Sequence, residues 1–229
     1  MTAALPRPLI CLVTDRRRLG APEGRDLDLL RAQIEIAAHA GVDMIQLRER
    51  DLPTRVLEDL VRTVMPLLDG TGSRLIVNAR LDVALTCGAA GVHLRHDSFP
   101  SDRARSMANP GFLIGRSIYS LDEARCEDQT AAADYLVFGT VFETPSKPEH
   151  TGTRLDDLAR VAAAVRIPVL AIGGVTIETV RGVADAGAAG LAAIGLFVMP
   201  SGGGQSDALA RTVRDVRRTF DRPDGLSGR

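Results

Sequence analysis

The segment that follows residue 45 carries three long polar side chains at alternate positions, Gln46, Arg48 and Arg50. In an extended chain, alternate side chains point to the same side. Polar groups of this size cannot enter an apolar core without partners. Two guanidinium groups side by side suit bidentate binding of phosphate. The pattern therefore predicts an anion-binding surface, and the alternative is a solvated rim.

Other residues that could bind a ligand or transfer a proton directly follow further apolar runs. They are Asn78, His96, Asp97, Ser117 and Tyr119. His93 lies inside such a run, so we expect it to be a structural residue, whereas His39 and His150 have the surroundings of surface residues.

Residues 141–148 combine hydroxyl groups with a lysine. Thr144, Ser146 and Lys147 alternate here with two prolines and a short apolar stretch. The segment is interpreted as a ligand-binding loop, and the alternative is an ordinary proline-rich turn. Glycines supply a second feature of this kind, because Gly173, Gly174 and Gly195 would let a phosphate group approach backbone N–H groups.

Short apolar runs alternate with helical patterns along the chain. The expected strands are Leu9–Thr14, Met44–Leu47, Leu75–Val77, Gly91–Leu94, Leu113–Ser117, Tyr135–Gly139, Val169–Ile172 and Gly190–Ala193. The clearest helical patterns are Asp26–His39, Thr54–Leu68 and Asp207–Phe220, where apolar residues recur three and four positions apart. Strands that are apolar throughout need cover on both faces. We therefore predict an α/β protein, a single (β/α)8 TIM barrel over residues 1–220, with an open doubly wound sheet as the main alternative.

This fold would bring the candidate residues together. In a (β/α)8 barrel the loops that follow the strands form the active site, and the loops after the last two strands often bind phosphate. The polar residues and glycines named above fall on these loops. The sequence therefore predicts a phosphate-handling barrel.

The composition limits the range of partners. Among 229 residues, 28 Lys and Arg face 29 Asp and Glu, a net charge of −1, so no broad basic field exists for nucleic acid or an anionic membrane. No stretch approaches the ~18 apolar residues of a membrane span. The three cysteines follow no metal or redox spacing and are expected to be reduced packing residues. We predict a cytoplasmic protein with a disordered tail over 221–229, and the class is compatible with a homo-oligomer.

Five stretches of the chain resemble the thiamine phosphate synthase superfamily, which also contains the thiazole tautomerases. They are Asp43–Asp51, Leu75–Leu85, Gly91–Leu94, Ala133–Lys147 and Ala171–Val175, and the similarity runs in unbroken order from about Leu9 to Phe197. The resemblance implies a (β/α)8 barrel that binds thiazole phosphate. Synthases of this superfamily couple a pyrimidine diphosphate to a thiazole phosphate and release pyrophosphate with the help of Mg2+.

The resemblance also implies roles for individual residues. Gln46 would hold the pyrimidine, and Ser117 would lie near its reacting part. The diphosphate would be held by Arg48, Asn78 and Lys147, while Arg50 stands where the family usually has Lys. The thiazole phosphate would be received by Thr144, Ser146 and the backbone near Gly174 and Gly195. The residues expected to take part in catalysis are Arg48, Ser117, Tyr119 and Lys147.

Two departures from the synthase pattern concern the metal. The expected Asn-Asp pair is Asn78-Ala79 here, and the later aspartate aligns with Ser98. Hard cations such as Mg2+ prefer carboxylate oxygens. Asp97, beside Ser98, is therefore the remaining candidate ligand for Mg2+.

The tautomerase branch is matched in part. Gly115–Ser117 and Val141–Thr144 are closer to that branch, yet its proton-transferring His is replaced by Tyr119. A phenol is a poor proton carrier near neutral pH, whereas guanidinium and ammonium groups can still stabilise a departing diphosphate. We therefore predict a thiamine phosphate synthase, a transferase. The alternatives are a thiazole tautomerase, which is an isomerase, and a catalytically silent regulatory protein that binds thiazole phosphate.

Overall fold

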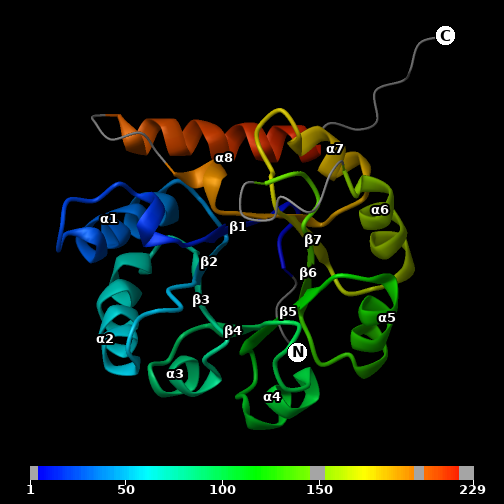
Figure 1. Ribbon diagram of the computed structural model, residues 1–229, viewed down its shortest axis with the longest axis horizontal. Helices are drawn as coiled ribbons and strands as arrows, with labels where there is room; N and C mark the ends of the chain where they lie inside the picture. The colour runs from blue at the N-terminus through cyan, green and yellow to red at the C-terminus, as the bar shows by residue number, and fades with distance from the viewer. Residues whose placement is uncertain (1–4, 145–152, 199–203, 222–229) are drawn as a thin grey trace.

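The computed structural model describes residues 5–144, 153–198 and 204–221, and Figure 1 shows a ring of strands enclosed by helices. The strands are β1 (Leu9–Val13), β2 (Met44–Leu47), β3 (Arg74–Asn78), β4 (Gly91–Leu94), β5 (Leu113–Ile118), β6 (Tyr135–Gly139), β7 (Val169–Ile172) and β8 (Gly190–Ala193). Neighbouring strands pair in parallel in chain order, and β8 pairs with β1 to close the barrel. The predicted (β/α)8 barrel is confirmed.

The helices form the outer layer of the barrel (Figure 1). They are α1 (Asp26–His39), α2 (Thr54–Val64), α3 (Leu81–Thr86), α4 (Ser101–Met107), α5 (Leu121–Thr130), α6 (Leu155–Ala164), α7 (Val180–Asp185) and α8 (Gln205–Asp221), with short 3-10 helices η1 (Arg16–Arg18), η2 (Met65–Leu68) and η3 (Gly195–Phe197). The helix predicted over 54–68 is broken into α2 and η2, because Pro66 has no N–H to continue the α-helical bonding.

The apolar residues of the strands divide between two cores. One set faces the barrel interior and is made of Leu9, Cys11, Val13, Met44, Ile76, Leu113, Tyr135, Val137, Leu170 and Ala192. Neighbouring residues such as Ile10, Leu12 and Ile45 face outward and pack with the helices. Alternate side chains of a strand point to opposite faces. The uniformly apolar strands are thus explained by burial on both faces.

The largest side chain of the barrel interior is a tyrosine. Tyr135 on β6 is fully buried, and a Cβ added at Gly115 on β5 would lie 2.1 Å from its Cζ atom. Only glycine at this position leaves room for the ring, because close-packed interiors do not admit such an overlap. The ring supports His93 from β4, whose ring centroid lies 5.7 Å away.

The structure also bears on the predictions for membrane spans, the cysteines and the C-terminal tail. Within the described ranges, no helix has both the length and the apolar character that crossing a membrane requires. The cysteines are free, but Cys126 is exposed, so the expectation that all three pack in the core is wrong for this one. Helix α8 reaches Asp221, the first residue of the expected tail, and residues 222–229 lie outside the described part.

Candidate active site

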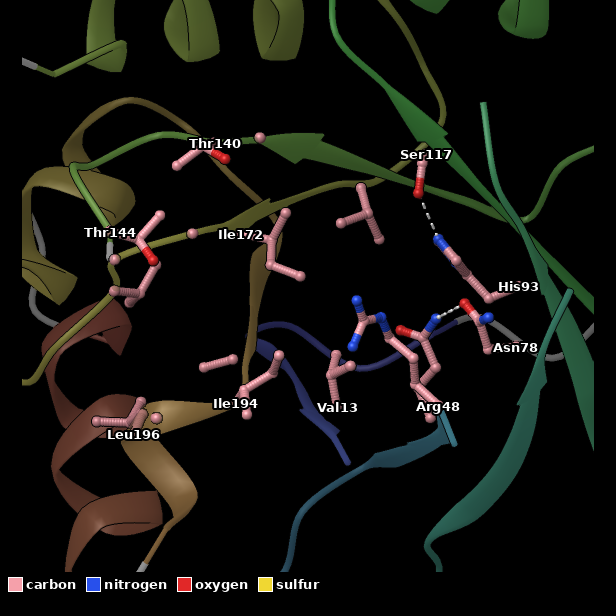
Figure 2. Close-up of a pocket in the computed structure, with 18 of the residues that line it drawn as sticks. Val13, Arg48, Asn78, His93, Ser117, Thr140, Thr144, Ile172, Ile194 and Leu196 are labelled. Atoms are coloured by element: carbon pink, nitrogen blue, oxygen red, sulfur yellow. Dashed lines mark hydrogen bonds between the residues drawn. The ribbon is translucent and has the colours of Figure 1, made fainter. Parts of the chain in front are cut away.

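A cavity of about 830 Å3 lies at the carboxyl ends of the strands. Nine of the predicted site residues line it: Gln46, Arg48, Arg50, Asn78, Ser117, Tyr119, Thr144, Gly174 and Gly195. Asp97 is not among the residues that line it, and Ser146 and Lys147 lie outside the described residues. Figure 2 shows two sides of this cavity, with Asn78, His93 and Ser117 on one and Thr144, Ile194 and Leu196 on the other.

The end of β2 places its polar side chains as the alternation predicted. Gln46 is 3% exposed, and its Nε2 atom donates to Oδ1 of Asn78 at 3.0 Å. Arg48 projects between the two sides of the cavity in Figure 2, and Arg50 also lines it. The amide pair Gln46–Asn78 retains further donor and acceptor positions for a ligand. Arg48 and Arg50 add charge beside it.

The intervening residue, Glu49, enters a buried ion network that the sequence did not indicate. Its carboxylate accepts from Oγ1 of Thr14 at 2.7 Å and from Nη1 of Arg16 at 2.9 Å. Arg16 also donates to Asp26 and Asp51. These hydrogen bonds, led by the one to Asp51, raise the pKa of Arg16, and the guanidinium lowers the pKa of the Asp51 carboxyl well below its usual range.

This network fixes the residues that face the cavity. Oγ1 of Thr14, while donating to Glu49, accepts the backbone N–H of Arg48 at 2.9 Å. Thus hydrogen bonds join β1, η1 and the end of β2. Those that involve Arg16 or Glu49 have an ionised partner and are therefore stronger than neutral hydrogen bonds. The hydrogen bond to Thr14 therefore fixes the backbone of Arg48, from which the side chain projects into the cavity.

Arginine dominates the charge of the cavity. The described residues that line it include Arg18, Arg48, Arg50 and Arg95, against a single carboxylate, Glu143. A concave surface with an excess of guanidinium groups attracts anions and binds them at short range. The cavity is therefore suited to phosphate groups although the whole chain is close to neutral.

His93 is buried, as expected, but it also reaches the cavity. Its Nε2 atom lies 2.8 Å from Oγ of Ser117, and Figure 2 marks this bond. Burial, with a smaller effect from Arg116, lowers the pKa of His93 to about 3. The imidazole is therefore neutral at physiological pH and holds the Ser117 hydroxyl. His93 was predicted to be a structural residue. The structure shows that it also lines the cavity, together with Ser117.

Tyr119 reaches the same cavity from the end of β5. Its ring meets that of His96 edge to face, with centroids 4.8 Å apart, and His96 also lines the cavity. The backbone oxygen of Tyr119 accepts from Nη2 of Arg154 at 2.8 Å. The structure thus brings together a phenol and an imidazole that come from different loops.

The opposite side of the cavity depends on two consecutive glycines. Gly173 and Gly174 have φ angles of 98° and 64°, in the left-handed region that favours glycine. A Cβ at Gly173 would lie 2.6 Å from Cγ2 of Thr140, and one at Gly174 would lie 2.5 Å from the backbone oxygen of Glu143. Side chains are therefore excluded here. Gly173 and Gly174 line the cavity together with Gly195 of η3, and phosphate binding at their backbone stays a prediction.

The sequence profile of the family described as thiamine monophosphate synthase matches residues 10–197. The chain belongs to this family. A putative thiamine-phosphate synthase from Geobacter sulfurreducens is 40% identical over 188 residues, which cover 82% of this chain and 85% of that protein. A thiamine-phosphate synthase from Methanoculleus marisnigri is 41% identical over 181 residues, 79% of this chain and 84% of that protein.

A solved structure agrees with the sequence comparison. The thiamine phosphate pyrophosphorylase from Pyrococcus furiosus superposes with a TM-score of 0.76 at 31% identity, covering 93% of this chain and 98% of that chain. The likeness extends over nearly the whole barrel. The family membership that the resemblance implied is confirmed.

The loop after β4 of this thiamine monophosphate synthase family member does not fit a carboxylate-coordinated metal. Asp97 pairs with Nη2 of Arg95 at 2.6 Å. Oγ of Ser98 accepts the backbone N–H of Arg95 at 3.0 Å, and Ala79, with φ of 62°, brings no ligand atom. Within the described ranges, no three His, Cys, Asp or Glu residues cluster so as to hold a metal ion.

A half-buried arginine of β5 keeps this loop in place. The guanidinium of Arg116 donates to the backbone oxygens of His96 and Phe99, each at 2.9 Å. Its Nε also lies 3.5 Å from Oε1 of Glu127. Arg116 is thus a structural element of the site that the sequence did not identify. The available signal was an arginine in a mostly apolar strand.

Proposed function

We propose that this protein is a thiamine phosphate synthase, which couples hydroxymethylpyrimidine diphosphate to thiazole phosphate and releases pyrophosphate. Family membership gives the class of reaction. The observation that carries the proposal is a single cavity lined both by arginines and by the glycines Gly173, Gly174 and Gly195. Two phosphate-bearing substrates can therefore enter the same cavity.

The chemistry asks the protein mainly to stabilise charge. The bond between the pyrimidine methylene carbon and the diphosphate oxygen breaks, and pyrophosphate leaves with the electron pair. The thiazole nitrogen then forms the new bond to that carbon with its lone pair. Preorganised cations at the departing group lower the barrier, because they need no reorganisation during the reaction. We assign this role to Arg48 and Arg50, together with Lys147.

The neutral groups orient the rings. We assign the pyrimidine to Gln46 and Ser117, and Asn78, which accepts a hydrogen bond from Gln46, to the diphosphate beside Arg48. The thiazole phosphate is assigned to Thr144, Ser146 and the backbone at Gly174 and Gly195. These assignments draw support from the positions of the described residues around the cavity. Those of Ser146 and Lys147 rest on the sequence resemblance.

Magnesium remains a prediction. The described side chains do not provide the carboxylate set that Mg2+ prefers. We infer that any Mg2+ enters with the diphosphate and is not held by protein carboxylates. A cytoplasmic location and a homo-oligomer also remain predictions from the sequence.

Thiazole tautomerase is kept as a second candidate because of one contact. Tyr119 occupies the place of the tautomerase histidine, but His96 lies against its ring with centroids 4.8 Å apart. Imidazole is the side chain best suited to carry protons near neutral pH. His96 therefore offers a proton carrier close to the position from which the histidine of the tautomerase pattern is missing.

The deciding experiment supplies the purified protein with hydroxymethylpyrimidine diphosphate, thiazole phosphate and Mg2+. Chromatography then measures thiamine phosphate. Multiple turnovers per enzyme support the synthase. Conversion of the unaromatised thiazole carboxylate phosphate without thiamine phosphate formation supports the tautomerase. Binding of thiazole phosphate without either product would contradict both enzymes and support a regulatory protein.

A further inference from the structure

Three consecutive arginines at the end of β1 have three different surroundings. Arg16 is buried among carboxylates. Arg17 is exposed, and its Nη2 lies 3.2 Å from Asp51. Arg18 lines the cavity, and its guanidinium takes part in no ion pair or hydrogen bond with another residue of the described ranges. The ion network around Arg16 therefore accounts for the first two arginines, and the third is directed to the cavity.

We propose that Arg18 binds the phosphate group of the thiazole substrate and selects for the phosphorylated thiazole. The inference rests on the proposed synthase function and names a further residue of its substrate site. A Cβ added at Gly195 would lie 3.6 Å from Nη2 and 3.8 Å from Nη1 of Arg18. The two terminal nitrogens are almost equally near, so the forked edge of the guanidinium faces the glycine backbone.

The loop that carries Arg18 is held firmly. Within η1 the N–H of Arg18 donates to the backbone oxygen of Asp15 at 3.0 Å, and Arg16 anchors the same turn to the carboxylates of Asp26, Glu49 and Asp51. These contacts position the backbone and leave the Arg18 side chain available. The opposite wall is fixed as well. Nε2 of Gln33 on α1 donates to the oxygen of Phe197 in η3 at 3.0 Å.

The chemistry on this side suits a phosphate monoester. Guanidinium presents several N–H donors in a plane that matches two phosphate oxygens. Gly195 leaves its backbone without a side chain beside these donors. An uncharged thiazole alcohol would leave the guanidinium unpaired, whereas the phosphate would neutralise it. Arg18 would therefore set a preference for phosphorylated thiazole and have little effect on the diphosphate substrate.

The test compares Arg18→Gln with Arg17→Gln, a neighbouring arginine that does not line the cavity. Calorimetric titration measures binding of thiazole phosphate, inorganic phosphate and hydroxymethylpyrimidine diphosphate to each folded variant. We expect Arg18→Gln to weaken both monophosphate probes about tenfold or more, the effect of losing a charge-assisted hydrogen bond. Diphosphate binding should stay within about twofold. Arg17→Gln should bind all three probes like the parent. The affinity of Arg18→Lys for the monophosphate probes should lie between those of the parent and Arg18→Gln, since lysine keeps the charge without the paired N–H donors of guanidinium.

Three results would overturn the proposal. The first is unchanged binding of thiazole phosphate by Arg18→Gln. The second is an equal weakening of that binding by Arg17→Gln, and the third is a loss of affinity in Arg18→Gln that is confined to the diphosphate substrate. Thermal unfolding of each variant shows whether the fold is intact, and Arg18→Lys replaces Arg18→Gln if the latter does not fold. Binding needs no turnover. If the parent makes no thiamine phosphate, the synthase function is refuted. If Arg18→Gln nevertheless weakens the binding of phosphate, the proposed contact between Arg18 and phosphate still holds.

Discussion

Nε2 of His93 lies 2.8 Å from Oγ of Ser117 at the edge of the cavity, while Nδ1 of the same imidazole is buried without a hydrogen-bond partner in the described part of the chain. A neutral imidazole carries one proton. Buried donors without an acceptor are rarer than buried acceptors without a donor. We therefore infer that Nε2 carries the proton and donates to Ser117. The hydroxyl proton of Ser117 is then free to donate to a substrate.

Ser117→Ala tests this arrangement. Removing the hydroxyl deletes a donor to the substrate, so we expect kcat/KM for the diphosphate substrate to fall about tenfold, or about 1.4 kcal/mol in barrier. Steady-state kinetics with thiazole phosphate in excess measures the effect. Ser106→Ala, an exposed hydroxyl on α4, is the control. A parent-like kcat/KM in folded Ser117→Ala would show that the hydroxyl makes no productive contact.

His93 also predicts a pH dependence of stability. Its pKa is lowered to about 3 in the folded protein, mainly by burial, against about 6.5 when unfolded. The unfolded chain therefore binds the proton first, and the stability contributed by neutral His93 is complete above pH 6.5 and lost as the pH falls from there toward 3. Between pH 7 and 5 the loss should be about 2 kcal/mol.

Urea unfolding of the parent and of His93→Asn at pH 7 and pH 5 measures this difference. Asn has no proton to gain in this range, so the variant should be less stable at pH 7 but should lose less stability on acidification. His39→Asn, on the exposed side of α1, should keep the steep dependence of the parent. Equal slopes for the parent and His93→Asn would remove His93 as the cause.

Breaking the network behind Arg48 should reduce both stability and substrate binding. Glu49→Gln removes the charge that faces Arg16 and Thr14 in a buried site, where loss of one partner typically costs about 3 kcal/mol. Because Thr14 also accepts the N–H of Arg48, KM for the diphosphate should rise. Chemical unfolding and kinetics measure the two effects, and Glu35→Gln on the exposed side of α1 is the matched control. A parent-like unfolding midpoint would contradict the structural role.

Much of the site could be predicted, because alternation and glycine placement are local signals. Gln46 in β2 and Arg48 and Arg50 just after it line the same cavity, as the alternate spacing of the three residues predicted. Other features depend on contacts that no local pattern encodes. Arg16, Arg17 and Arg18 are identical neighbours in sequence, yet Arg16 is buried, whereas Arg17 and Arg18 are exposed and only Arg18 lines the cavity. Arg16 is buried because it pairs with Glu49 and Asp51, which are distant in the sequence.

The same reasoning explains what was missed around Ser117. His93 was predicted to be structural because it lies within an apolar strand. Its contact with Ser117 follows from β4 and β5 being adjacent, with His93 in register with Gly115. That register is a property of the closed barrel. The break at Pro66, by contrast, was visible in the sequence, since proline ends α-helical bonding wherever it falls inside a helix.

Restoring carboxylates should strengthen the dependence of the reaction on Mg2+. In Ala79→Asp combined with Ser98→Asp, two hard oxygen ligands return to the loops after β3 and β4, so Mg2+ should activate at lower concentration. The backbone permits both changes. Aspartate tolerates the φ of 62° at Ala79, and at Ser98 it can still accept the N–H of Arg95. Thiamine phosphate formation at increasing Mg2+ measures the effect, and a titration that overlays the parent would place these positions away from the metal.

The last prediction separates the two candidate enzymes at one residue. Tyr119 lines the cavity beside His96, and imidazole carries protons near neutral pH far better than phenol does. Tyr119→His should therefore create or raise tautomerase activity, with a rate that increases as the imidazole deprotonates. Synthase activity, which needs no proton carrier at this position, should change less than tenfold, or about 1.4 kcal/mol in barrier.

Both reactions are assayed on the same purified variants, with Tyr119→Phe as the control that keeps the ring and removes the hydroxyl. His96→Asn in the Tyr119→His background asks whether the neighbouring imidazole contributes. If Tyr119 only packs at the rim, Tyr119→His will gain no tautomerase activity. If the parent already converts the thiazole tautomer rapidly and Tyr119→Phe abolishes that conversion, tautomerisation is the native reaction and the phenol takes part in it.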